Sequence, residues 1–199
     1  TSSNVQKAMW AVGELGLEHE RFDIGVTFGK NREPAYLNMN PNGLVPTLQD
    51  GDFILWESNS IIRYLARNQG KGKLEGTDPK MTALANQWMD WQLTVLGPAI
   101  TPAFWGLIRT PEEKRDLAAI AASQSKTIEA MKILDAQLGK TAYVAGKEFT
   151  MGDIPVGVMT YRFWQLVPER PELPHLQRWY AGLQKRAAFH NAVESVPLT

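Results

Sequence analysis

The chain has 199 residues, 44% of them hydrophobic, and its 21 basic and 21 acidic side chains give a formal net charge of zero. This length allows one large domain or two small ones, and the balanced charge disfavours nucleic acid or an anionic membrane as a partner. No apolar run is long enough to cross a bilayer. Cysteine is absent, which excludes disulfides, a cysteine nucleophile and thiolate metal sites. The three histidines (His19, His175 and His190) lack the spacing of a zinc motif.

The first part of the chain combines helical and extended patterns. Good N-cap residues precede apolar positions at helical spacing, which predicts a helix from about Asn4 to Leu15 that ends near Gly16. The alternating stretch "HERFDI" (19–24) predicts a short strand. The turn-rich loop that follows has room for at most one helical turn, near residues 34–37.

A β-hairpin and a helix are expected next. Two apolar segments, 47–49 and 53–56, are predicted as strands joined by Asp50-Gly51, where glycine tolerates a positive φ. A helix of about a dozen residues should follow Ser58 and close at Gly70. The order up to Gly70 is therefore helix, strand, loop, two strands and helix.

Beyond a glycine- and charge-rich linker, the patterns predict only helices. A long apolar helix with proline interruptions is expected from about Met81, and Thr110-Pro111 before two acidic residues predicts another helix start. Thr150 and Asp153 form a variant of the capping box, and residues 174–189 predict a closing helix. One face of the helix after Pro111 is expected to consist of Leu117, Ile120, Gln124, Ile128, Met131, Leu134 and Leu138.

Four motifs, in this order and spacing, resemble those of cytosolic glutathione S-transferases: "NPNGLVP" (40–46), "ESNSIIRYLA" (57–66), "QWMDWQ" (87–92) and "FTMGDI" (149–154). The resemblance covers nearly the whole chain and points to a bacterial, nu- or theta-like class with a serine/threonine–asparagine site. It implies a thioredoxin-like α/β domain (1–70), a linker (71–79) and an all-α helical bundle domain (80–199), assembled as a homodimer. The family's first strand should precede Thr1, so we expect it to lie outside the numbered chain.

The resemblance implies a glutathione site around Pro46. The Val45–Pro46 peptide is expected to be cis, with the backbone N–H and C=O of Val45 free to pair with the cysteinyl part of glutathione. Glu57 should bind the γ-glutamyl ammonium, and Ser58 the neighbouring carboxylate at a helix N-terminus. Taken alone, these residues also fit an ordinary proline at a strand start and a plain helix cap.

The contact to the glycyl carboxylate of glutathione is expected to depart from the family pattern. Gly43 and Leu44 stand where many members have a histidine or lysine. Asn42 is one candidate for this contact, and Lys30 or Arg32 from the preceding loop could supply the charge.

The group that activates the thiol is expected in "SSNVQK" (2–7), because the thiolate is the nucleophile and the family stabilises it at the start of this helix. This stretch contains no tyrosine and the chain no cysteine, which excludes the tyrosine- and cysteine-type classes. With Lys7 in register, the family pattern favours Ser2, with Asn4 as a second donor and Ser3 as the main rival. The alternative is that all three only cap the helix.

Phe104, Trp105 and Ile108 are expected to line the pocket for the second substrate between the domains, with Trp164 as a further candidate; the alternative for each is helix core. The implied activity is attack of the glutathione thiolate on a hydrophobic electrophile. Glutathione would be the co-substrate, with no other cofactor and no metal, in a cytoplasmic detoxification enzyme. The competing interpretations are a non-catalytic binding or regulatory module and a glutathione-dependent peroxidase, lyase or disulfide reductase.

Overall fold

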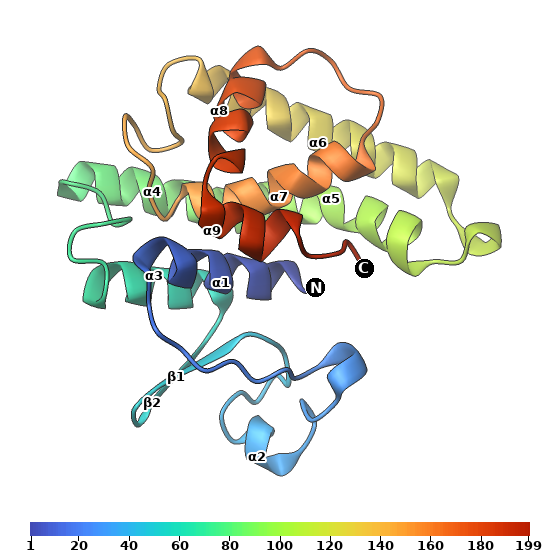
Figure 1. Cartoon of the computed structure of the whole chain (residues 1–199). Coiled ribbons are helices and arrows are strands. Elements are labelled where there is room, and N and C mark those ends of the chain that lie inside the picture. The colour runs from blue at the N-terminus through green and yellow to red at the C-terminus, as the bar shows by residue number, and fades with distance from the viewer.

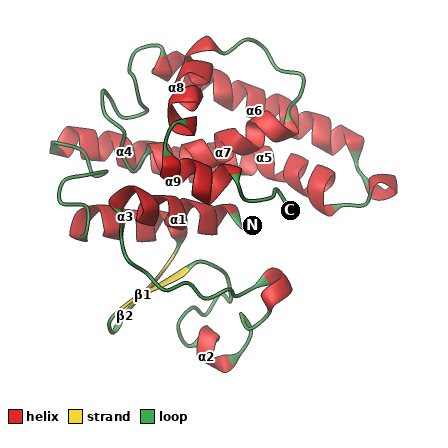
Figure 2. Ribbon diagram, in the orientation of Figure 1, coloured by secondary structure: helices red, strands yellow, loops and turns green.

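The computed structural model describes residues 1–199, apart from the side chain of Val26, and its N-terminal part contains a β-hairpin among helices. In the hairpin, Thr47 lies opposite Trp56 and Asp50 opposite Phe53. Figures 1 and 2 show the hairpin and α2 on one side of the paired helices α1 and α3, with the later helices on the other side. The elements of this part are α1 (Ser3–Leu15), η1 (Val26–Phe28), α2 (Pro34–Leu37), β1 (Thr47–Asp50), β2 (Phe53–Trp56) and α3 (Ser58–Asn68).

The rest of the chain is helical. The long helix expected from about Met81 is present as α4, η2, α5 and η3 in direct succession, and η2, η3 and η5 are π-helical turns. The expected order of a small α/β part followed by helices is therefore observed. The elements are α4 (Pro79–Trp91), η2 (Gln92–Leu96), α5 (Gly97–Phe104), η3 (Trp105–Arg109), η4 (Glu112–Lys114), α6 (Leu117–Leu138), α7 (Asp153–Leu166), α8 (Pro174–Gln184), α9 (Ala187–Phe189) and η5 (His190–Glu194).

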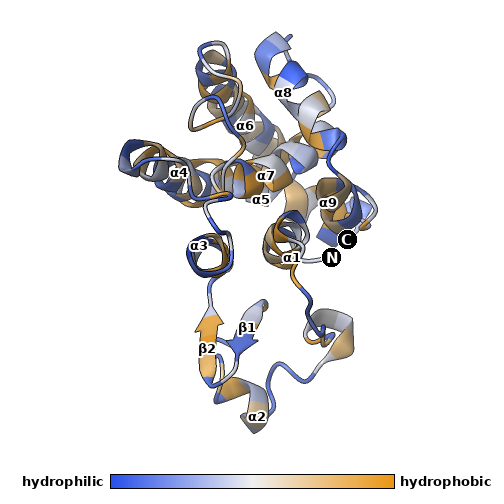
Figure 3. Ribbon diagram, turned by 60° about the vertical axis from the view of Figure 1, so that its left-hand side comes forward, coloured by the Kyte–Doolittle hydropathy of each residue, from blue (hydrophilic) through white to orange (hydrophobic). Residues whose placement is uncertain are grey.

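Trp10 anchors α1 in the helical part of the molecule. Its side chain is fully buried, and its ring packs 4.7 Å from that of Phe189 and 5.7 Å from that of Phe149, measured between centroids. Gly157 of α7 makes room for it, because a Cβ at that position would lie 2.8 Å from the indole ring. Figure 3 shows α1 and α3 nearly end-on, as a layer between the hairpin and the other helices. α1 thus precedes the hairpin in sequence but packs into the helical core.

The predicted contact between Thr150 and Asp153 is present at the start of α7, but Gly152 and not Thr150 occupies the N-cap position. The carboxylate of Asp153 accepts hydrogen bonds from the backbone N–H of Thr150 (2.8 Å) and from its hydroxyl (3.2 Å). It also accepts from the backbone N–H of Val144 (3.1 Å) and from Nε1 of Trp179 (2.9 Å). Burial raises the pKa of Asp153 to about 6, and these hydrogen bonds oppose that rise. One buried carboxylate therefore ties the start of α7 to α8 and to the loop before it.

Two predictions for the N-terminal part were wrong. Residues 19–24 are not a strand: they form no backbone hydrogen bonds to the described residues, and Phe22 is 71% exposed. Alternation alone does not make a strand, because a ladder needs a partner, and β1 and β2 pair with each other. The hairpin turn also lies one residue later than expected. Asp50 is still paired with Phe53, so Gly51, with φ of 58°, is the first turn residue.

Two helix boundaries in the C-terminal part also differ from the prediction. Residues 112–114 form only a 3₁₀ turn, and α6 begins at Leu117, because Asp116 caps it by accepting from the backbone N–H of Ala119 (2.9 Å). Arg115 holds the preceding segment back by donating to the carbonyl of Leu107 (2.9 Å). The closing helix breaks after Gln184 and restarts as α9.

The expected core face of α6 is only partly correct. Leu117 is 70% exposed because it lies at the first position of the helix. Gln124 and Ile128 are half-buried. The positions that are fully enclosed are Ile120, Ser123, Thr127, Ala130, Met131, Leu134 and Leu138.

Candidate active site

The N-termini of α1 and α3 meet at a side-chain hydrogen bond. The hydroxyl of Ser58 donates to Oδ1 of Asn4 over 3.2 Å. Ser58 is buried, whereas the preceding Glu57 is exposed and connects β2 directly to α3 with φ of 72°, a conformation uncommon for a non-glycine residue. Each helix start carries unpaired N–H groups and the positive end of the helix dipole. Two such ends lie together here, which favours binding of an anion.

Lys7 fixes the orientation of the Asn4 side chain. Its ammonium donates to Oδ1 of Asn4 (3.1 Å) and to Oε1 of Gln92 (2.8 Å). Because Ser58 donates to the same oxygen of Asn4, the amide nitrogen of that exposed side chain is left to face outward as a donor. Burial lowers the pKa of Lys7 to about 7; the nearby charge of Arg162 lowers it further, and that of Glu57 opposes the change.

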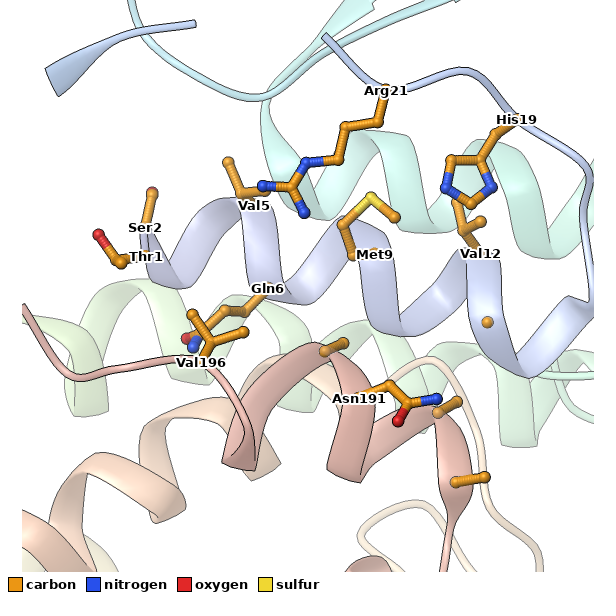
Figure 4. Close-up of a pocket in the computed structure, with 14 residues that line it drawn as sticks. Thr1, Ser2, Val5, Gln6, Met9, Val12, His19, Arg21, Asn191 and Val196 are labelled. Atoms are coloured by element: carbon orange, nitrogen blue, oxygen red, sulfur yellow. The ribbon is translucent and has the colours of Figure 1, made fainter. Parts of the chain in front are cut away.

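Ser2 and Ser3 lie beside this junction. Ser2 occupies the N-cap position of α1, yet its side chain makes no capping hydrogen bond; Ser3 is the first residue of the helix, and both are half-buried. Ser2 lines a groove of about 330 Å³ between α1 and the C-terminal segment, with Arg21 and His19 reaching over α1 (Figure 4). Of the three candidate donors, Asn4 is the one that the structure joins to Ser58.

The Val45–Pro46 peptide is cis, as predicted. The backbone N–H and C=O of Val45 have no hydrogen-bond partner within the described residues. The carbonyl of the neighbouring Leu44, by contrast, accepts from the hydroxyl of Tyr36 and from Nδ2 of Asn40, each over 2.7 Å. The loop is therefore held from one side, and the polar groups of Val45 are available to an incoming chain.

The candidates for the glycyl end lie in the loop before this peptide. Asn42 is exposed, and its backbone N–H donates to Oδ1 of Asn40 over 3.1 Å. Arg32 reaches this loop, with Nη1 donating to the carbonyl of Asn42 over 3.4 Å. Lys30 is exposed with φ of 65° and has no side-chain hydrogen bond to the described residues. The structure therefore brings Arg32, rather than Lys30, into contact with Asn42.

The candidates for the second-substrate pocket separate into two groups. Phe104 is buried, Trp105 is 58% exposed and Ile108 is half-buried at the end of the long helix. The rings of Phe104 and Trp105 meet edge to face with centroids 6.4 Å apart. Trp164 has other aromatic neighbours, with its ring 5.1 Å from that of Phe163. The structure thus brings Phe104 and Trp105 together but places Trp164 in a different aromatic cluster.

Arg162 of α7 is a residue that the sequence reasoning missed. It is 7% exposed, and its guanidinium lies 4.1 Å from the centroid of the Phe104 ring. Burial lowers its pKa to about 10, and the neighbouring Arg109 lowers it further. A cation–π contact contributes roughly 0.5–2 kcal/mol, less than the several kcal/mol that burying an ion costs. The signal that the sequence offered for this residue was a single arginine within the mostly apolar run of residues 154–166.

The described side chains contain no group of three or more histidine, aspartate or glutamate residues placed to hold a metal ion. Among the helices that the structure describes, none combines the length and apolarity needed to cross a membrane.

Comparison with known proteins agrees with this fold. Residues 1–68 match the glutathione S-transferase N-terminal domain family and residues 118–182 the glutathione S-transferase C-terminal domain family. The chain is 42% identical to glutathione S-transferase GstB of Escherichia coli strain K12, over 96% of this chain and 93% of that protein. It is 30% identical to glutathione S-transferase 3 of Zea mays, over 99% and 91% respectively.

Among solved structures, a theta-class glutathione S-transferase from Xanthomonas axonopodis pv. citri with glutathione bound has a TM-score of 0.94 and 45% identity. That alignment covers 100% of this chain and 95% of the other. The fold is thus a small thioredoxin-like domain followed by a helical domain, as predicted. The chain belongs to the glutathione S-transferase family, and the prediction of a transferase is confirmed.

Proposed function

We propose that this transferase binds glutathione at the junction of α1, α3 and the Val45–Pro46 loop and adds its thiolate to an electrophile. The observation that carries the proposal is the Ser58–Asn4 hydrogen bond, which places two helix N-termini at one point. The relative from Xanthomonas, at 45% identity, was solved with glutathione bound, which supports the same ligand here.

Each part of glutathione has a proposed partner. The free backbone groups of Val45 pair with the cysteinyl residue as an added strand would. Glu57 binds the γ-glutamyl ammonium, and Ser58 binds its carboxylate with help from the dipole of α3. Asn42 and the basic side chains of the preceding loop, Arg32 or Lys30, meet the glycyl carboxylate.

Thiol activation requires a fall in the pKa of bound glutathione by about two units, or roughly 3 kcal/mol. We assign this to hydrogen-bond donors at the start of α1. The contacts favour Asn4, because Lys7 and Ser58 hold its oxygen and leave its amide N–H groups to face an anion. Ser2, whose hydroxyl is not used as a cap, is the second candidate, and Ser3 the third.

The electrophile then lies against Phe104, Trp105 and Ile108. The sulfur forms a bond to the electrophilic carbon, the leaving group departs with its electron pair, and the thiol proton passes to solvent. We propose domain limits of 1–70 and 80–199 around a linker at 71–79, and a cytoplasmic homodimer, as the family resemblance implies.

The test uses the unmodified protein on immobilised glutathione, followed by turnover of 1-chloro-2,4-dinitrobenzene with free glutathione. Retention together with release of chloride supports the transferase. Retention without turnover supports a binding module instead. Reduction of cumene hydroperoxide without conjugation of the aryl chloride would favour a peroxidase.

A further inference from the structure

Arg162 is a buried cation that has no anionic partner in the part of the chain that the structure describes. It forms no hydrogen bond or ion pair there, and its Nε is enclosed without an acceptor. A buried lysine can shed its proton, but an arginine guanidinium stays charged in proteins. Burying such a charge is unfavourable unless it is paired. An acceptor from outside the chain would offset this cost at Arg162.

The surroundings of Arg162 are aromatic and positive. Its guanidinium lies 4.1 Å from the centroid of Phe104, and that of Arg109 lies 5.8 Å from the same ring. Arg109 donates to the backbone oxygen of Thr199 (2.6 Å), and the ammonium of Lys7 already has two side-chain amide acceptors. Of these three cations, Arg162 is the one without an acceptor among the described residues.

We propose that the second substrate is an electrophile carrying a negative charge, such as an aryl carboxylate, and that Arg162 binds this charge. Phe104 and the exposed edge of Trp105 hold the apolar part of the molecule. The proposal rests on the proposed function, whose chemistry it leaves unchanged: a carbon–sulfur bond forms, the leaving group departs with its electron pair, and the thiol proton goes to solvent. It adds a charge requirement to a pocket expected to be hydrophobic.

The competing occupant is the glutathione thiolate itself, at the start of α1. The two cases differ in their consequences. A cation that stabilises the thiolate accelerates reaction with every electrophile alike. A cation that binds the charge of the electrophile discriminates between a charged substrate and its neutral counterpart.

The experiment compares 4-chloro-3,5-dinitrobenzoate with its primary amide, which undergo the same displacement of chloride. We expect Arg162→Gln to lower the ratio of kcat/KM for the anion to that for the amide by about 10- to 100-fold, the loss of one charge-assisted hydrogen bond. The matched control is Arg170→Gln, since Arg170 stacks on Trp164 at 4.5 Å and not on Phe104. That variant should leave the ratio unchanged.

An equal loss for both substrates, with a raised pKa of the bound thiol, would assign Arg162 to the thiolate and overturn the proposal. A preference for the anion that disappears above pH 7 would assign the charge to Lys7, whose pKa is about 7, and also overturn it. A preference for the anionic substrate that persists to pH 9 supports the assignment of the charge to Arg162.

Binding without turnover keeps the proposal testable if a variant folds poorly or the protein is not a transferase. Calorimetry on the unmodified protein should show 3,5-dinitrobenzoate binding more tightly than 3,5-dinitrobenzamide, with Arg162→Lys retaining part of the difference. Equal affinities would contradict the inference whatever the outcome on immobilised glutathione. Failure of that retention, with the anion still preferred, would contradict only the proposed function.

Discussion

At the scale of single residues, the hydrogen bonds to Asn4 define its chemical role. With its oxygen occupied by Lys7 and Ser58, its amide can act only as a donor toward a ligand. A donor to the thiolate stabilises the charged form far more than the thiol. Asn4→Ala should therefore raise the pKa of bound glutathione toward its solution value, measured from the thiolate ultraviolet band across pH.

The matched variants are Ser2→Ala and Ser3→Ala, which should shift this titration less. Binding of S-methylglutathione, which cannot form a thiolate, should hardly change in any of the three. A titration moved by Ser2→Ala but not by Asn4→Ala would return the role to Ser2. Three unchanged titrations would place the thiolate elsewhere.

Lys7 predicts a pH dependence of stability. Burial lowers its pKa from 10.5 to about 7, so between these values the unfolded chain binds a proton that the folded protein has released. The free energy of unfolding therefore increases as the pH rises from about 7 toward 10.5. This gain in stability is lost as the pH falls back to about 7. Relative to Lys7→Met, the unmodified protein should gain about 2–3 kcal/mol from pH 7 to 9, measured by urea unfolding.

The control for this slope is Lys126→Met, an exposed lysine on α6. It should leave the pH dependence unaltered. A slope shared by the unmodified protein and Lys7→Met would show that other groups cause it.

At the scale of elements, the start of α7 depends on Asp153. Removing its carboxylate in Asp153→Ala leaves buried donors unpaired at Thr150, Val144 and Trp179. We expect a loss of about 3–5 kcal/mol in the free energy of unfolding, measured by chemical denaturation.

Asp116→Ala is the matched comparison, because Asp116 caps α6 at an exposed site through one backbone N–H. It should cost only about 1 kcal/mol. Similar losses in both variants would mean that the buried hydrogen bonds of Asp153 add nothing beyond a cap.

These two caps also show what sequence reasoning can reach. The Thr150–Asp153 pattern is local, so spacing alone predicted it. The start of α6 was misplaced because Arg115 draws the chain back to the carbonyl of Leu107, a tertiary contact that no local pattern contains. The strand predicted at 19–24 was wrong for a related reason. Alternation of apolar and polar residues indicates which side chains could share one face, whereas a strand also needs a neighbouring strand to pair with.

The candidate site likewise contains features that short motifs predict and one that depends on a tertiary contact. The Val45–Pro46 peptide and the Glu57-Ser58 helix start follow from short motifs. Arg162 could not be placed beside Phe104 from sequence, because 58 positions separate them and an arginine among apolar residues does not reveal which ring it covers.

On the scale of the whole molecule, α4 and η2 present an apolar stripe at helical spacing. Leu84 is 44% and Val95 40% exposed, with the half-buried Trp91 between them. Arg63 joins α3 to α4 through Asn86 over 2.6 Å. We expect this face to form a two-fold homodimer, so light scattering should give about twice the 22.3 kDa chain mass.

Leu84→Glu should return the mass to that of one chain, whereas Leu117→Glu, at a 70% exposed position on α6, should not. A single-chain mass for the unmodified protein at micromolar concentration would contradict the dimer.

Alanine substitutions at two glycines are expected to change the stability in opposite directions, because one of them contacts the N-terminal part and the other does not. Gly157→Ala pushes a methyl group against Trp10, at 2.8 Å, and should destabilise by about 1–3 kcal/mol. Gly182→Ala, at an exposed position in the last turn of α8, meets nothing within 4 Å and should stabilise by about 0.5–1 kcal/mol. Thermal unfolding distinguishes the two, and a stabilised Gly157→Ala would show that the indole can move aside.

The close contact between Gly157 and Trp10 also limits how the N- and C-terminal parts of related enzymes can be exchanged. Because the buried indole of Trp10 lies where a Cβ of residue 157 would be, an N-terminal part taken from a relative brings its own residue to position 10, which must then pack against a surface shaped for tryptophan. A chimera should fold well only when the residues at positions 10 and 157 come from the same parent. The two parts are therefore coupled through this contact, and one cannot be exchanged without regard to the other.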